Sequence, residues 1–167
     1  MKRTLLLTLI LAGCSSGPSP ESPERARIQR QLDELYRPLA AMVEESRLSY
    51  IDFKKKEGRQ ESLPTDRTLT DEEMKRWIDH IEKEIFPRND RMCALIRSKR
   101  GLSEGPEPAS WQALLEHQDG WREDHQKWRK EGVAYPFHAR TSFPRTLERE
   151  LKASIAALEE RKAALSK

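Results

Sequence analysis

The sequence predicts an all-α protein, an antiparallel four-helix bundle with proline-kinked helices. The chain has 167 residues, of which 35% are charged and 7% are aromatic, and it lacks the alternating β-branched runs that build a sheet. Four stretches carry apolar residues at helical spacing, and short or moderate connections join them. No apolar run reaches the roughly 20 residues that a membrane-spanning helix needs.

The first helix is expected to run from Pro23 to about Lys56, with Ser22 as its N-cap. Pro38 has no amide proton for the preceding turn, so we expect a kink near Tyr36 rather than a straight rod. The apolar seam of this helix consists of Ile28, Leu32, Leu35, Leu39, Met42 and Phe53.

The second helix is expected to begin at a capping box formed by Thr70 and Glu73, and to end at Gly101. Pro87 lies inside this stretch, and either one kinked helix or two helices meeting at an angle fits the pattern. Its apolar stripe consists of Met74, Trp77, Ile78, Ile81, Ile85, Met92, Leu95 and Ile96.

A third helix is predicted from the apolar stripe that starts at Trp111 and runs to Gly132. Residues 133–143 have no helical pattern and form an aromatic loop. The last helix is expected to begin near Pro144 and to continue almost to Lys167, and its apolar residues are Leu147, Leu151, Ile155, Leu158 and Leu165.

The N-terminus has the pattern of a secretory signal, because two basic residues precede a short apolar run. The segment Leu11-Ala12-Gly13-Cys14 closes this run and resembles the lipobox of bacterial lipoproteins. That resemblance implies lipid attachment to Cys14 and cleavage after Gly13. Ser15 is not acidic, which in this family implies an outer-membrane anchor facing the periplasm. The alternative is an ordinary secreted precursor with a cysteine near its cleavage site.

These features divide the chain into a signal peptide at 1–13, the lipid-bearing cysteine with a Pro/Ser-rich tether at 14–23, and a helical domain at 24–167. Cleavage removes two basic residues and leaves 29 basic against 28 acidic ones. So balanced a charge disfavours nucleic acid as a partner. Cys93 is then the one remaining cysteine, and its apolar neighbours predict a buried thiol.

No catalytic motif, cofactor motif or helical Glu-x-x-His pair is present, so we expect neither an enzyme nor a metal site. One helical face carries Trp121, His125 and Trp128, which suggests a ligand pocket; core packing is the alternative. The aromatic loop suggests a recognition surface, although such loops also close the ends of bundles. Its candidate contact residues are Tyr135, Phe137, His138 and Arg140.

The segment from Trp121 to Leu158, with Trp128 ahead of the aromatic loop, resembles bacterial helical domains of unknown function. This resemblance implies a helix, an aromatic loop and a second helix, and no activity. The sequence therefore favours a membrane-anchored envelope lipoprotein that acts as a protein-interaction or scaffolding module with an envelope protein as partner. The alternative is a bundle that binds a small molecule or a metal in the periplasm. The oligomeric state stays open.

Overall fold

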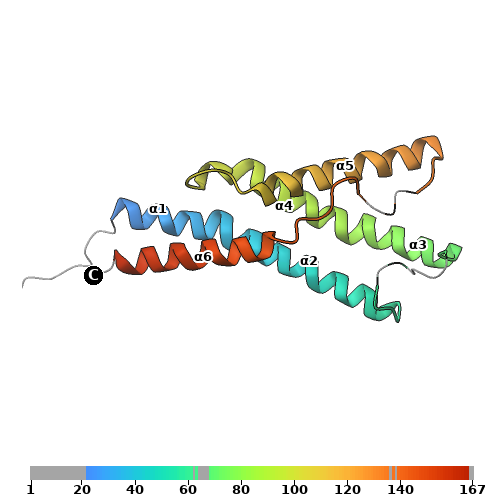
Figure 1. Ribbon diagram of the computed structural model, residues 1–167, viewed down its shortest axis with the longest axis horizontal. Coiled ribbons are helices and arrows are strands. Elements are labelled where there is room, and N and C mark those ends of the chain that lie inside the picture. The colour runs from blue at the N-terminus through green and yellow to red at the C-terminus, as the bar shows by residue number, and fades with distance from the viewer. Residues whose placement is uncertain (1–21, 62, 64–67, 136, 138, 166–167) are drawn as a thin grey trace, which may run out of the picture.

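A computed structural model of the chain describes residues 22–61, 63, 68–135, 137 and 139–165 (Figure 1). Every regular element in this described part is helical, which confirms the all-α prediction. The predicted signal peptide, Cys14 and the part of the predicted tether before Ser22 lie outside the described residues. None of the described helices is both long enough and apolar enough to span a membrane.

The first helical run is continuous and consists of α1 (Pro23–Gln31), a π turn η1 (Leu32–Tyr36) and α2 (Arg37–Lys56). The Ser22 side chain accepts a hydrogen bond of 3.2 Å from the Arg25 amide, so the predicted N-cap is confirmed. The interruption expected near Tyr36 is the π turn. Because the ring of Pro38 would crowd a carbonyl one turn earlier, the wider turn relieves that clash.

The second run repeats this design with α3 (Asp71–His80), a π turn η2 (Ile81–Ile85) and α4 (Phe86–Lys99). Thr70 and Glu73 form the predicted capping box, with the Thr70 amide 2.9 Å from the Glu73 carboxylate. The backbone continues through Pro87 as one helical run, which decides between the two alternatives that the sequence allows.

The third and fourth runs are α5 (Ala109–Glu131) and α6 (Leu147–Ala164). Gly132 caps α5 with a φ of 66°, a left-handed conformation that favours glycine. Helix α6 begins three residues later than expected, because Pro144 accepts the Leu147 amide in a turn that precedes the helix.

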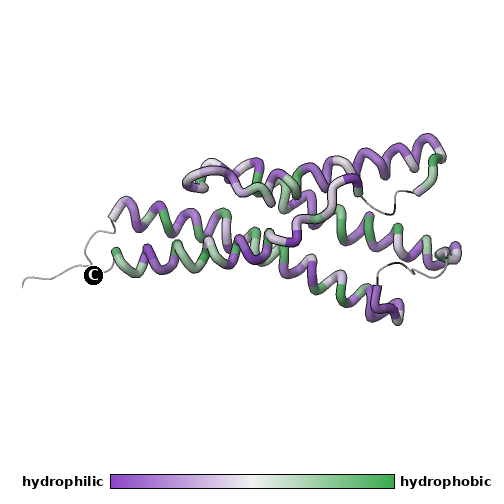
Figure 2. The backbone as a smooth tube through the Cα atoms, in the orientation of Figure 1, coloured by the Kyte–Doolittle hydropathy of each residue, from purple (hydrophilic) through white to green (hydrophobic). Residues whose placement is uncertain are grey.

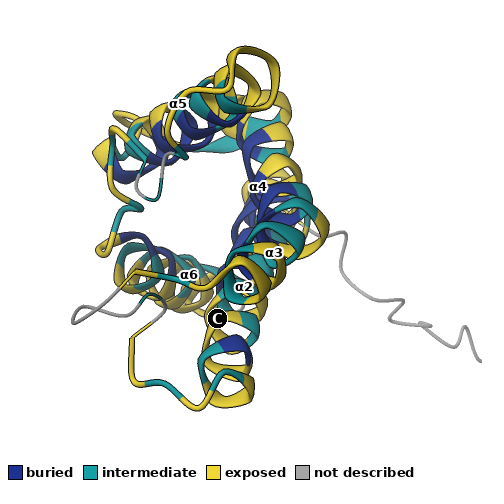
Figure 3. Ribbon diagram, turned by 90° about the vertical axis from the view of Figure 1, so that its right-hand side faces the viewer, coloured by how far each residue is buried: buried dark blue, intermediate teal, exposed yellow. Residues whose placement is uncertain are grey.

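The helices pack in a chain of contacts: α6 lies against α1, η1 and α2, then α2 lies against α4, and α4 against α5 (Figure 1). Apolar residues recur along every helix (Figure 2). In the end-on view, the buried residues of α4 and α5 lie on the faces that these helices turn toward each other (Figure 3).

Two apolar clusters make up the core. The first contains Cys93, which is fully buried as predicted, and burial raises the pKa of its thiol to about 11. The second lies toward the C-terminal end of α2 and joins it to α3, η2 and α5. Its buried members are Phe53, Trp77, Ile81, Ile85, Phe86 and Trp121.

Candidate functional site

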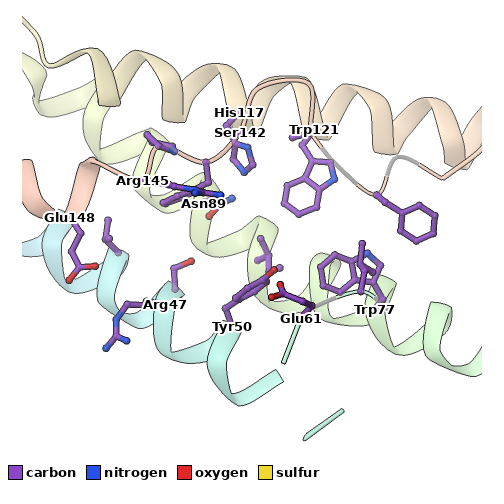
Figure 4. Close-up of a pocket in the computed structure, with 18 of the residues that line it drawn as sticks. Arg47, Tyr50, Glu61, Trp77, Asn89, His117, Trp121, Ser142, Arg145 and Glu148 are labelled. Carbon is purple, nitrogen blue, oxygen red and sulfur yellow. The ribbon is translucent and has the colours of Figure 1, made fainter. Parts of the chain in front are cut away.

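A groove with a volume of about 1200 Å³ lies between α2, the α3–η2–α4 run, α5 and the connection that leads into α6 (Figure 4). This volume exceeds that of a typical small-molecule site, which is roughly 300–1000 Å³. Most of the side chains around it are apolar. The groove is lined by Val43, Ser46, Arg47, Tyr50, Glu61, Leu63, Thr68, Leu69, Met74, Trp77, Ile85, Asn89, His117, Trp121, Phe137, Ala139, Ser142, Phe143, Pro144, Arg145 and Glu148.

Helical spacing brings the wall residues of each helix to one side. His117 and Trp121 are four residues apart on α5, and their rings lie 5.4 Å apart. Ile85 and Asn89 have the same spacing across the junction of η2 and α4. The π turn η2 inserts one extra residue between α3 and α4. It therefore sets the rotation of Ile85 and Asn89 about the helix axis relative to Trp77 on α3.

One end of the groove is aromatic (Figure 4). The Trp121 ring meets Phe86 edge-on, with centroids 5.3 Å apart, and Trp77 packs against Phe53 at 5.5 Å. Phe137, from the connection that follows α5, packs against the cluster that contains Trp77 and Trp121 and also lines the groove. The buried rings of Trp77 and Trp121 give this end an aromatic wall.

The opposite end is polar, and Figure 4 shows Arg145, Asn89, His117 and Ser142 gathered there. His117 Nδ1 lies 2.7 Å from the Thr141 carbonyl oxygen. Because a carbonyl only accepts, Nδ1 carries the proton and Nε2 is left as an acceptor. Burial lowers the pKa of His117 more than the Thr141 carbonyl raises it, so the ring is neutral at pH 7.

Some of the charged residues that line the groove have an ion-pair partner, and Arg145 has none among the described residues. Arg47 makes two hydrogen bonds to Glu44, of 2.7 and 2.6 Å. Glu148 is paired with Lys152 at 2.5 Å. Arg145 is exposed and has no carboxylate within 4 Å in the part of the chain that the structure describes. Its charge is therefore uncompensated at the polar end.

Three buried polar atoms in the groove-lining residues have no hydrogen-bond partner among the described residues. They are the indole nitrogens of Trp77 and Trp121 and the Oδ1 of Asn89. A buried polar group without a partner costs about 1–3 kcal/mol. These three atoms need hydrogen-bond partners, which water or a bound molecule in the groove can supply.

His125 does not line the groove but belongs to a neighbouring cluster behind it. Its Nε2 donates to a Glu82 oxygen at 2.7 Å, and the ring lies 5.0 Å from Phe86 and 5.2 Å from Trp128. Burial raises the pKa of Glu82, but hydrogen bonds from Arg129 and His125 outweigh it and hold the pKa below its usual value. His125 is thus a core histidine with a carboxylate partner.

The remaining predicted candidates are divided between packing and surface roles. Tyr135 packs edge-on against Trp128 at 4.8 Å in the His125 cluster. Arg140 turns back to α5, where it donates to Asp124 at 3.0 Å and to the Gly120 carbonyl at 3.3 Å. His138 lies outside the described residues. Of the seven aromatic-face and loop candidates, the structure places Trp121 and Phe137 in the groove.

Several groove residues were not singled out from the sequence. Trp77 belongs to the predicted apolar stripe of its helix, and this pattern indicates which face the side chain is on but not that a groove lies beside it. Asn89 lies at a buried helical position between apolar residues, and a polar residue there is a signal that could have been used. Arg145 and Ser142 carry no local signal, because the fold alone brings them to the polar end.

No group of three or more His, Cys, Asp or Glu side chains suited to a metal ion occurs among the described residues. Comparison with protein-family models, with curated proteins and with solved structures found no match to this chain.

Proposed function

We propose that this chain is an envelope lipoprotein whose helical domain binds an elongated, largely apolar small molecule in the groove. The groove itself is the observation that carries the binding function. Its volume of about 1200 Å³, its aromatic end and its partnerless polar atoms suit a ligand site better than a packed core.

The anchor in this proposal is lipid on Cys14, inferred from the Leu11-Ala12-Gly13-Cys14 segment. Two or three acyl chains hold a protein at a membrane almost irreversibly. Helix α1 begins at Pro23, so the tether between the lipid and the helical domain is short. We further propose an outer-membrane location facing the periplasm, because Ser15 follows the cysteine.

The proposed architecture is an antiparallel four-helix bundle that is open along one side. The contacts run from α6 through α2 and α4 to α5, and the groove occupies the open side. The connection between α5 and α6 crosses this opening and supplies Phe137 and Arg145 to the lining. A closed bundle would fill the same space with core side chains.

A protein-interaction module is the second candidate, with an envelope protein as partner. The observation that favours it is a pair of exposed apolar side chains on α2, Leu48 at 48% and Ile51 at 42% exposure. They lie three residues apart on one helical face. Two side chains make only a small apolar patch, so the groove supports ligand binding more strongly than this pair supports a protein partner.

Binding is tested with N-phenyl-1-naphthylamine, an apolar probe whose fluorescence rises when it leaves water. Ser46 lines the groove on α2, and Ser46→Trp places a large side chain into it. Ser98 is exposed on α4 and does not line the groove, so Ser98→Trp is the matched control. We expect saturable probe binding to the wild type and to Ser98→Trp, and loss of binding in Ser46→Trp. Equal binding by all three proteins would contradict the proposal.

Anchoring is tested separately by fractionating cells that express the wild type or Cys14→Ser. We expect the wild type in the membrane pellet and the variant in the soluble fraction as an unprocessed or unlipidated form. Retention of Cys14→Ser in the pellet with unchanged processing would contradict anchoring by lipid on Cys14.

A further inference from the structure

The groove is polarised along its length, and this polarity, which rests on the proposed binding function, specifies the chemistry of the ligand. Arg145, Ser142, Asn89 and His117 gather at one end, whereas Trp77 and Trp121 lie toward the other (Figure 4). Phe137 packs against the cluster that contains these two tryptophans. A molecule that satisfies both ends has one polar head and a long apolar body.

The charge at the polar end indicates the sign of the head. Glu44 neutralises Arg47, and Lys152 neutralises Glu148, whereas Arg145 keeps an uncompensated positive charge among the described residues. Glu61 lies beside Tyr50 toward the Trp77 end of the groove, apart from Arg145, and its carboxylate is exposed to water, which screens its charge (Figure 4). One free guanidinium suits a single anionic group, and its planar fork matches a carboxylate.

The neighbouring polar groups place that carboxylate more closely. The Ser142 hydroxyl is a donor on the same connection as Arg145. His117 Nε2 is an acceptor, because Nδ1 donates to Thr141, so it repels a carboxylate oxygen rather than binding it. The head group therefore lies between Arg145 and Ser142.

The apolar end suits an alkyl chain better than a peptide. The helical walls have backbone groups that already hydrogen-bond within the helix, the rest of the lining comes from the connections that precede α3 and α6, and no strand edge occurs among the described residues. A peptide in this groove would bury amide groups without partners, whereas an alkyl chain has none to satisfy. The aliphatic side chains of Leu63, Leu69, Met74 and Ile85 line the groove together with the aromatic ones.

From these observations we infer that the groove binds a single-chain fatty carboxylate. Its carboxylate lies on the Arg145 guanidinium and the Ser142 hydroxyl, and its alkyl chain runs past Trp121 toward Trp77 and Phe137. The ligand class is thus a free fatty acid, and a diacyl phospholipid or a peptide is a different outcome of the test.

The test uses displacement of N-phenyl-1-naphthylamine by three ligands of equal chain length: dodecanoate, dodecanol and dodecylamine. Arg145→Gln removes the proposed partner of the head group. Arg149→Gln removes another exposed arginine, four residues further along the chain, that does not line the groove, and so is the matched control. Circular dichroism checks that both variants keep the helical fold.

We expect dodecanoate to displace the probe best, and Arg145→Gln to weaken dodecanoate about tenfold while Arg149→Gln leaves it unchanged. Equal displacement by dodecanoate and dodecanol, with no effect of Arg145→Gln, would overturn the fatty-carboxylate assignment. If Ser46→Trp still abolished probe binding in that case, the binding function would survive. If no ligand displaced the probe and Ser46→Trp had no effect, the proposed function itself would fail. Preferential displacement by a phospholipid or an acidic peptide would also overturn the assignment.

Discussion

The Nε2 of His125 lies 2.7 Å from a carboxylate oxygen of Glu82, and this hydrogen bond ties α5 to the π turn η2. Arg129 donates to the same Glu82 oxygen at 3.0 and 2.6 Å. The π turn ends at Ile85, which lines the groove. The His125 cluster therefore supports one wall of the groove from behind, without facing a ligand.

This relationship predicts that His125→Ala destabilises the protein by about 2 kcal/mol, because a charge-assisted hydrogen bond and the packing on Phe86 are lost. Probe binding per folded molecule should be retained, since His125 is not a groove residue. Urea denaturation measures the first quantity and fluorescence titration measures the second. Loss of probe binding at unchanged stability would instead make His125 a ligand contact.

Two other histidines predict a dependence of stability on pH. Burial holds the pKa of His80 and of His117 below the usual value of 6.5. The unfolded chain therefore takes up protons at higher pH than the folded one, and stability falls as pH drops below about 6.5 toward the folded-state pKa values. The carboxylates with lowered pKa values act only at lower pH, so urea midpoints at pH 7.5 and pH 5.5 isolate the histidines.

His80→Phe tests this assignment because it keeps an aromatic ring on Phe53, on which His80 stacks at 4.2 Å. The His80 Nε2 has no hydrogen-bond partner among the described residues, so the substitution removes a proton-binding group at little cost in contacts. We expect a smaller difference between the two urea midpoints than in the wild type. An unchanged difference would show that His80 does not titrate in this window.

The Cys93 thiol is expected to react slowly with a disulfide reagent in the native state. It is fully buried, and its pKa of about 11 keeps the thiolate fraction at pH 8 on the order of a hundredfold below that of an ordinary thiol. The measurement uses Cys14→Ser protein, in which Cys93 is the single cysteine, with and without urea. Rapid, complete labelling without denaturant would contradict the placement of Cys93 in the core.

Gly132→Ala is expected to destabilise the protein by about 1 kcal/mol, because the φ of 66° at the end of α5 is strained for a residue with a side chain. Gly101→Ala is the control, since Gly101 has no positive φ and its added carbon would meet open space. Thermal denaturation compares the two variants. Equal destabilisation by the two substitutions would contradict the idea that the positive φ at position 132 requires glycine.

Much of the helical layout could be predicted from local sequence. The Ser22 cap, the Thr70–Glu73 capping box and the end of α5 at Gly132 are set by residues within one turn of each boundary. The π turns were not predicted, because a proline indicates an interruption but not whether the chain kinks or widens its turn. Their form depends on the packing on both sides of Pro38 and Pro87.

The groove could be predicted only in part. Apolar spacing identifies the inward face of each helix but not whether the opposite face fills the space. It therefore assigns Trp77 to an apolar stripe and leaves Trp121 between a ligand pocket and core packing. Their rings do pack into the core and also line the groove. Arg145 reaches the polar end through the course of the connection before α6, which no local pattern specifies.

Photolabelling with a dodecanoate that carries a diazirine in its chain tests most directly whether the groove is the binding site. After irradiation and digestion, mass spectrometry identifies the labelled peptides. We expect label on the peptides that contain Trp77 and Trp121, competition by unmodified dodecanoate, and loss of this label in Ser46→Trp but not in Ser98→Trp. Label confined to the exposed face of α2 around Leu48 and Ile51, and unaffected by Ser46→Trp, would contradict groove binding.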